Sequence, residues 1–120
     1  INEMSPASFE EYCHELVEKN GWKVYKNSSI DGGIDIRALK EEKDGEIKTL
    51  LVQCKLWRTP IPPGAVRDFK AGCDEEKVEG EKQLMFISFS KFSPGATAYA
   101  NQHGIMLVNG DNLIENNKKQ

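Results

Sequence analysis

The sequence lacks the features that would assign it to several special classes of protein. It has no apolar run of about 18 residues or more, no signal-peptide pattern, no low-complexity segment and no internal repeat. These absences predict a soluble protein that does not enter a membrane. With 120 residues there is room for one sheet covered by a few helices, so we expect a single domain over residues 1–120. Because the chain begins at Ile1, we expect it to be a fragment of a larger protein.

Cysteine and histidine are also scarce. Cys13, Cys54 and Cys73 are odd in number and far apart, and each falls on an apolar face of a predicted element. This pattern favours reduced thiols used as small core residues, which is typical of a cytoplasmic protein. His14 and His103 show no metal-ligand spacing, so no zinc site is predicted. A phosphate-binding glycine loop is missing too, which argues against a domain that senses a small nucleotide.

A strong positive charge is absent as well. The net charge of −3 argues against a domain that coats nucleic acid by bulk electrostatics. Charge is nevertheless segregated along the chain. Acidic residues gather at 10–18, 41–46 and 74–81, whereas residues 48–70 are mostly basic among their charged members. A local basic strip is therefore compatible with the overall acidity.

Periodicity and capping signals predict the element order α-β-β-β-α-β-α-β. The expected helices cover residues 5–21, 65–78 and 93 to about 102, and the expected strands cover 22–26, 34–40, 47–57, 83–90 and 105–108. Ser5 and Ser93 are the expected N-caps, with Gly21 as a C-terminal stop. The turn at Asp44-Gly45 predicts an antiparallel hairpin, and the late strands joined by a helix should be parallel. We expect an α/β sandwich with a mixed sheet.

Polar residues in the middle of an apolar strand mark the candidate site. In the stretch L50-L-V-Q-C-K-L-W57, alternation places Gln53 and Lys55 side by side on one face. In I34-D-I-R37 the same rule places Ile34 and Ile36 on one face and Asp35 on the other. Because the two strands form the predicted hairpin, Asp35 can lie across from Gln53 and Lys55.

This set of groups has a recognisable chemical use. The Asp35 carboxylate, the Gln53 side-chain oxygen and the Cys54 carbonyl are hard oxygen donors suited to Mg²⁺. Lys55 beside them can hold or deprotonate an attacking water and stabilise phosphate charge. Glu10 lies roughly 90° from the centre of the apolar stripe of the first helix, which brings it to the edge of the core. It could reach the metal, a bound water or Lys55.

These residues carry a resemblance to a known family. The stretches F9-E10, G21-W22, D31-G-G-I-D35, Q53-C-K55, V66-R-D-F69, F92-S-P-G-A96, Y99-A100, G104-I105 and L107-V-N-G110 resemble the Mrr-like branch of the PD-(D/E)XK nuclease superfamily, in the right order along essentially the whole chain. The resemblance implies a restriction-endonuclease-like three-layer sandwich. Its core is αβββαβ with a mixed central sheet, followed by an extra C-terminal αβ.

The resemblance also implies a function and residue roles. Asp35 matches the metal-binding aspartate, Gln53 stands in place of the (D/E), Lys55 matches the catalytic lysine, and Glu10 matches the acidic residue of the first helix. The implied activity is a type IV restriction-like endodeoxyribonuclease that uses Mg²⁺, with Mn²⁺ as a substitute, in restriction or anti-phage defence. Gln53 is neutral where most of the superfamily carries an acid, which predicts weaker metal binding before DNA arrives.

Partners follow from the same resemblance. DNA is the expected substrate, most simply double-stranded. One site cuts one strand, so we expect a homodimer or an assembly through missing domains. Arg58, Arg67 and Lys70 are the candidates for phosphate contacts, although solvated charge is the common role of such residues.

Plainer interpretations stand beside these. Asp35 and Lys55 could form a structural ion pair, Glu10 could be an ordinary helix-edge glutamate, and Asp31 with Gly32 and Gly33 could be only a tight turn. Trp57 is expected in the core or over the stem of Lys55. The rival function is a catalytically inactive nucleic-acid-binding module of the same fold.

Overall fold

The computed structural model describes residues 5–27 and 33–109 and contains three helices and five strands within them. The elements are α1 (Pro6–Lys19), β1 (Lys23–Asn27), β2 (Ile36–Glu41), β3 (Ile47–Lys55), α2 (Pro63–Glu75), β4 (Glu81–Ser88), α3 (Pro94–His103) and β5 (Ile105–Val108). Their order confirms the order expected from the sequence.

The helix ends follow the predicted capping chemistry. The Ser5 hydroxyl accepts a hydrogen bond from the backbone N–H of Ser8 at 3.1 Å, and the Ser93 hydroxyl accepts one from Ala96 at 3.1 Å. Helix α1 ends just before Gly21, whose φ of 91° lies in the left-handed region. Helix α2 was expected to start at Ala65, but it begins at Pro63, because proline needs no N–H partner in the first turn.

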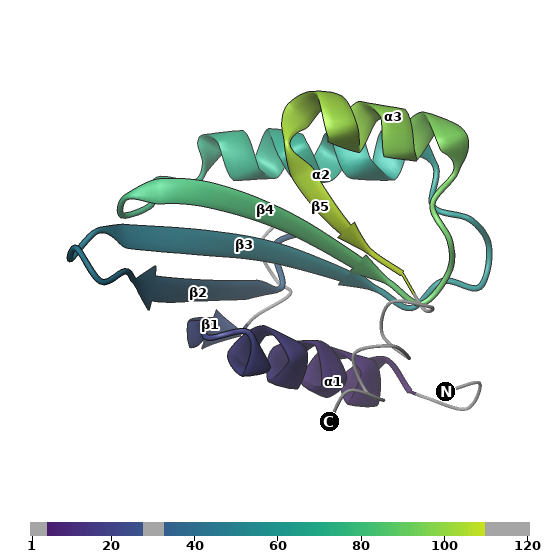
Figure 1. Cartoon of the computed structure of the whole chain (residues 1–120). Helices are drawn as coiled ribbons and strands as arrows, with labels where there is room; N and C mark the ends of the chain where they lie inside the picture. Colours follow the sequence, from purple (N-terminus) through teal and green to yellow (C-terminus); the bar gives the residue numbers. More distant parts are fainter. Residues whose placement is uncertain (1–4, 28–32, 110–120) are drawn as a thin grey trace.

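The five strands form one sheet in the order β1-β2-β3-β4-β5 (Figure 1). Strands β2 and β3 are antiparallel, with Ile36 opposite Val52 at the end of their ladder, which confirms the predicted hairpin. Strand β4 is parallel to both β3 and β5. The sheet is therefore mixed, as expected.

Helix α1 covers one face of the sheet, and α2 and α3 cover the other (Figure 1). Leu50, Val52 and Cys54 of β3 pack in the cluster that contains α1, whereas Leu51 packs in the cluster that contains α2 and α3. The three-layer fold and the alternation predicted for β3 are both confirmed. Gln53 and Lys55 accordingly lie on the α2 side.

The predicted alternation of the second strand was wrong at its start. Ile34 packs in the α2 cluster and Ile36 in the α1 cluster, so the two side chains do not share a face. The reason is that regular pairing begins only at Ile36, and Gly33 precedes it with a φ of 99°. Strict period-two alternation does not hold for a segment outside the ladder. Of the two positions expected for Trp57, the core is excluded, because β3 ends at Lys55 and Trp57 is 40% exposed.

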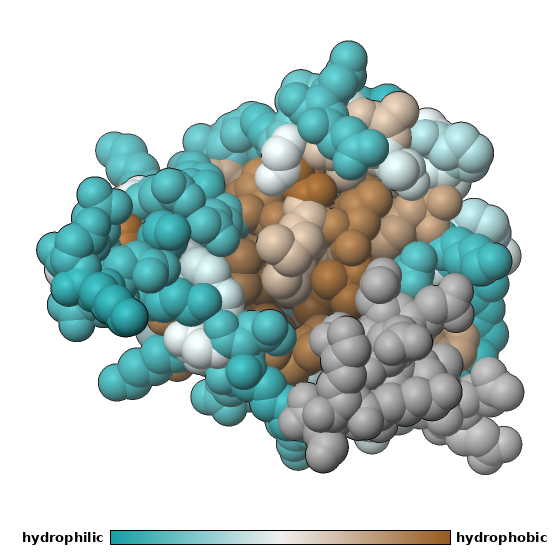
Figure 2. All heavy atoms as spheres, in the orientation of Figure 1, coloured by the Kyte–Doolittle hydropathy of each residue, from teal (hydrophilic) through white to brown (hydrophobic). Residues whose placement is uncertain are grey.

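The surface and the thiols complete the fold. In Figure 2 apolar residues gather in the middle of the view, where Figure 1 has β4 and the edge strand β5, and Met106 of β5 is 53% exposed. All three cysteines are free and buried. Among the described residues, no helix is long and apolar enough to cross a bilayer.

Candidate functional site

The candidate site lies where the β2–β3 ladder ends. The backbone N–H of Asp35 donates to the Val52 carbonyl at 2.8 Å, and the backbone N–H of Cys54 donates to Oδ2 of Asp35 at 2.7 Å. Asp35 is only 7% exposed. Two hydrogen bonds thus hold its main chain and its carboxylate against the strand that carries Gln53 and Lys55.

Opposing effects act on the pKa of Asp35. Burial raises the pKa of Asp35 above its ordinary value, and the hydrogen bond from the Cys54 N–H acts in the opposite direction. The negative charge of Glu10 raises this pKa further, whereas the positive charges of Lys55 and Arg37 lower it. The net effect is a raised pKa. Glu10 and Lys55, which come from different elements, are therefore both near enough to Asp35 to change its ionisation.

Gln53 and Lys55 line a cavity of about 230 Å³ between the end of β3 and the N-terminal half of α2. The cavity wall consists of Gly33, Gln53, Lys55, Trp57, Pro62, Ala65, Asp68 and Phe69. Gln53 is 7% exposed, and its Nε2 would lie 3.2 Å from a Cβ atom built on Gly33. Glycine at this position therefore lets the backbone approach the Gln53 amide closely.

Lys55 is held over an aromatic ring. Its Nζ lies 5.1 Å from the centroid of the Trp57 ring, which is within the range of a cation–π contact. Trp57 therefore lies beside the ammonium group, one of the two positions considered for it. An ammonium so placed is restrained while it stays open to the cavity.

The donor set fits a hard divalent cation. Lys55 directs its carbonyl toward β4, where it accepts a hydrogen bond from Phe89 N–H at 3.0 Å. Because successive carbonyls of a strand point to opposite sides, the Cys54 carbonyl points toward β2, beyond its last paired residue and beside Asp35. A carboxylate, an amide and this carbonyl are oxygen donors that suit Mg²⁺. In residues 5–27 and 33–109 no three His, Cys, Asp or Glu side chains gather as a metal cluster.

The thiols of Cys54 and Cys73 are buried groups with raised pKa values. A hydrogen bond with Cys13, together with burial, raises the pKa of the Cys54 thiol well above its ordinary value. Burial likewise raises the pKa of the Cys73 thiol to about 12. Neutral thiols of this kind behave as small core groups.

Glu10 is half-buried on α1 and lies at the edge of the core, as predicted. It also lines a groove along α1 with Ala7, Glu11, His14, Glu15, Glu18 and Asn27. Its charge acts on both Asp35 and Cys54. Glu10 thus approaches the site from the α1 face, opposite the cavity that holds Lys55.

The three candidate phosphate contacts differ in their surroundings. Arg67 is exposed on α2. The guanidinium of Arg58 lies 5.4 Å from the centroid of the Phe89 ring. Lys70 is already paired with Asp74 at 2.7 Å. Asp31 and Gly32 lie outside the described residues. Arg67 is thus better placed than Lys70 to meet a phosphate.

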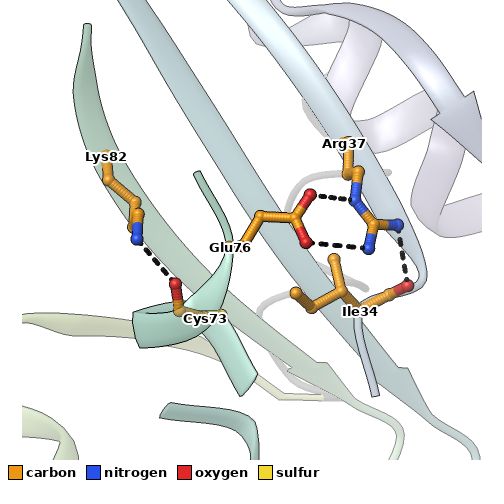
Figure 3. A network of polar contacts seen from close by, with 5 residues as sticks. All are labelled: Ile34, Arg37, Cys73, Glu76 and Lys82. Atoms are coloured by element: carbon orange, nitrogen blue, oxygen red, sulfur yellow. Dashed lines mark hydrogen bonds and ion pairs between the residues drawn. The ribbon is translucent and has the colours of Figure 1, made fainter. Parts of the chain in front are cut away.

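Sequence reasoning missed an ion pair next to the site. Arg37 of β2 is 3% exposed, and its Nε donates to Oε2 of Glu76 at 2.7 Å (Figure 3). The available signal was Arg37 itself, a charged residue between the apolar Ile36 and Ala38 of a predicted strand. Its partner follows the end of α2, which no local pattern indicates.

Comparison with known proteins gives the family. A family model described as restriction endonuclease (Mrr_cat) matches residues 1–116. Among solved structures, the DNA modification-dependent restriction endonuclease AspBHI superposes with a TM-score of 0.70 at 11% identity, covering 93% of this chain and 30% of that one. A search of curated proteins found no match.

Two further structures show the same fold. The MspJI restriction endonuclease, solved with a 27-mer oligonucleotide, has a TM-score of 0.60 at 18% identity and covers 87% of this chain and 25% of that one. A repair endonuclease from Pyrococcus abyssi has a TM-score of 0.60 at 19% identity, with coverages of 89% and 47%. The chain thus spans less than half of each of these three proteins. Because the family match includes nearly every residue, the chain belongs to the Mrr_cat restriction endonuclease family.

Proposed function

We propose that this domain hydrolyses DNA phosphodiester bonds with a divalent metal, Mg²⁺ or in its place Mn²⁺. Asp35, the side-chain oxygen of Gln53 and the carbonyl of Cys54 would hold the ion. The observation that carries this proposal is the 2.7 Å hydrogen bond from Cys54 N–H to Asp35, which holds the carboxylate against the strand that carries Gln53 and Lys55. Mg²⁺ bound there supplies positive charge that stabilises the phosphate and favours ionisation of the attacking water.

The protein groups would divide the remaining work. The water oxygen would attack phosphorus in line with the departing 3′ oxygen, the P–O3′ bond would break, and the 3′ oxygen would take a proton from solvent, which leaves a 5′ phosphate and a 3′ hydroxyl. Lys55 orients this water from the cavity side and neutralises charge on the phosphate. Glu10, acting from the α1 side, assists by orienting the water or accepting its proton. Arg58, Arg67 and Lys70 would contact neighbouring phosphates.

The biological setting follows from the substrate. We infer a type IV restriction-like role in defence against incoming DNA, in the cytoplasm, where the three free buried thiols suit the reducing environment. One site cuts one strand, so cleavage of double-stranded DNA requires a homodimer or further domains that bring two copies together.

A plasmid-nicking assay tests the proposal. The purified domain should nick supercoiled DNA with Mg²⁺ or Mn²⁺ and not with EDTA. Asp35→Asn and Lys55→Ala should each lower the rate by a factor of about 10² or more, because each removes a group required in the transition state. Lys43→Ala, in the exposed turn after β2, is the matched control and should cut normally.

Two outcomes would contradict the proposal. Nicking retained by both folded variants would remove Asp35 and Lys55 from the chemistry. DNA binding by the wild-type domain without metal-dependent nicking would favour the inactive binding module instead.

A further inference from the structure

The C-terminal end of α2 is attached to two strands by polar contacts (Figure 3). Arg37 of β2 forms a fork with Glu76, the C-cap of α2, through Nε to Oε2 at 2.7 Å and Nη2 to Oε1 at 3.3 Å. Nζ of Lys82, from β4, donates to the Cys73 carbonyl at 2.6 Å. These contacts fix the end of α2 against the sheet.

Arg37 makes one more contact, and it points toward the candidate site. Its Nη1 donates to the Ile34 carbonyl at 3.3 Å, and Ile34 is the residue directly before Asp35 (Figure 3). The segment needs such support, because the β2–β3 ladder ends at Ile36 and Gly33 adopts a left-handed conformation that glycine enters freely. Arg37 thus restrains the backbone on the side of Asp35 that the ladder does not reach.

Stability alone does not account for this ion pair. A buried guanidinium loses its hydration, and the gain from its carboxylate partner roughly offsets that loss, so an apolar side chain would stabilise a strand at least as well. The bidentate fork instead fixes the plane of the guanidinium, which aims Nη1 at a defined point. That point is the carbonyl of Ile34, the residue before Asp35, which is the predicted metal ligand.

We propose that Arg37, oriented by Glu76, is a positioning residue that holds Asp35 in place for metal binding. Its consequence for catalysis rests on the proposed function, whereas its effect on the Asp35 backbone does not. The same contact joins Asp35 to α2, the helix that carries Arg67 and Lys70. One ion pair therefore sets the metal ligand relative to a candidate DNA-contacting helix.

The test replaces both partners together. Arg37→Met with Glu76→Met removes the fork without leaving a lone buried charge, and such exchanges usually preserve folding. The matched control is Glu42→Gln with Lys48→Gln, an ion pair at 3.5 Å at the end of the β2–β3 hairpin that lies away from Ile34. Should the double variant fail to fold, Arg37→Lys keeps the charge and loses the fork, and the same measurements apply to it.

Amide hydrogen exchange is the primary readout. The Cys54 N–H, bonded to the Asp35 carboxylate, and the Asp35 N–H, bonded to Val52, should exchange about tenfold faster or more in the variant, while the N–H groups of β4 stay protected. In the nicking assay the half-saturating Mg²⁺ concentration should rise about tenfold to a hundredfold, with an unchanged KM for DNA.

Failure of this inference is distinguishable from failure of the proposed function. Unchanged exchange at both amides in a folded variant would overturn the positioning role, whether or not the domain cuts DNA. If the wild-type domain does not nick DNA while the variant still shows faster exchange at Asp35 and Cys54, the positioning role holds and the proposed function fails.

Discussion

Asp35 shows at the scale of one residue why functional groups cost stability. A carboxylate that is 7% exposed has lost most of its water, and the Cys54 N–H and the nearby cations only partly replace it, since its pKa remains raised. A site built only for stability would not carry an ionised group here. The raised pKa is what we expect of a ligand whose compensating charge comes with the metal.

We therefore predict that Asp35→Asn makes the metal-free domain more stable at neutral pH. Asparagine keeps an oxygen that accepts from Cys54 and removes the buried charge. Because the pKa of Asp35 is higher in the folded state than the ordinary value of 3.8, folding binds a proton, and stability is lost as pH rises through the folded pKa. The advantage of Asp35→Asn should thus grow with pH above about 4 and then level off.

Urea unfolding of both proteins from pH 3.5 to pH 8, in EDTA, measures this difference. The control is Asp68→Asn, which removes an exposed carboxylate from α2. A variant that is less stable than the wild type at pH 7 would show that the hydrogen bond to ionised Asp35 outweighs the cost of its burial.

The contrast between Asp35 and Arg37 shows what a sequence reveals about a site. Gln53 and Lys55 could be placed on one face because alternation is regular along β3, and Asp35 could be placed near them because it directly precedes the paired part of β2. The Arg37–Glu76 pair could not, because its members are separated by 39 positions and meet through the packing of a helix end on the sheet. Long-range contacts of this kind follow from the three-dimensional fold, and no local pattern encodes them.

At the scale of elements, the turn between α2 and β4 passes very close to another strand. Gly80 has a φ of 70°, and a Cβ atom built on it would lie 1.8 Å from the carbonyl oxygen of Ile47. The added Cβ would be bonded directly to the main chain of Gly80, and the oxygen belongs to the main chain of Ile47. Neither atom can therefore move aside without a shift of the backbone. This approach lets β4 enter the sheet parallel to β3 with Glu81 opposite Lys48.

We predict that Gly80→Ala costs ~4 kcal/mol or more of unfolding free energy, because a steric clash adds to the left-handed strain. Gly45→Ala separates these two contributions. Its φ is 88° and nothing lies within 4 Å of the added Cβ, so it should cost only about 1 kcal/mol. Denaturant unfolding of both variants gives the comparison. Similar losses for the two would mean that the β4 turn relaxes around the added methyl group.

Element boundaries show where sequence patterns are limited. The hairpin, the helix caps and the parallel late strands were predictable, because each depends on neighbours in sequence. The second helix was expected from residue 65, yet it starts at Pro63. The prediction that Ile34 and Ile36 share one face was wrong, because β2 pairs regularly with β3 only from Ile36 onward. The extent of such a ladder depends on the partner strand, which no local pattern shows.

At the scale of the whole molecule, the net charge of −3 has to be reconciled with a DNA substrate. Exposed carboxylates lie along α1. Arg58, by contrast, follows β3, and Arg67 lies on α2. In Figure 1 these two helices cover opposite faces of the sheet. DNA approaching from the α2 side would thus meet Arg58 and Arg67, although Asp68, Asp74 and Glu75 are also exposed on α2, while the more acidic α1 stays on the far face.

This arrangement predicts which cations contribute to DNA binding. Each phosphate neutralised by a cation releases a counterion, so removing one contact lowers the slope of log K against log salt by about one. Arg67→Gln should show this full decrease. Lys70→Gln should show a much smaller one, because its ammonium is already paired with Asp74 at 2.7 Å and gives up that partner to reach a phosphate.

Fluorescence anisotropy with a labelled duplex, in Ca²⁺ to prevent cleavage and over a range of salt concentrations, measures these slopes. Lys43→Gln is the control, because its turn lies at the opposite end of β3 from Lys55. At the usual rise per residue of a strand, the two ends of β3 are about 25 Å apart. Its slope should equal that of the wild type. Equal decreases for Arg67, Lys70 and Lys43 would mean that DNA senses only the overall charge of the domain, and α2 would then have no special part in binding.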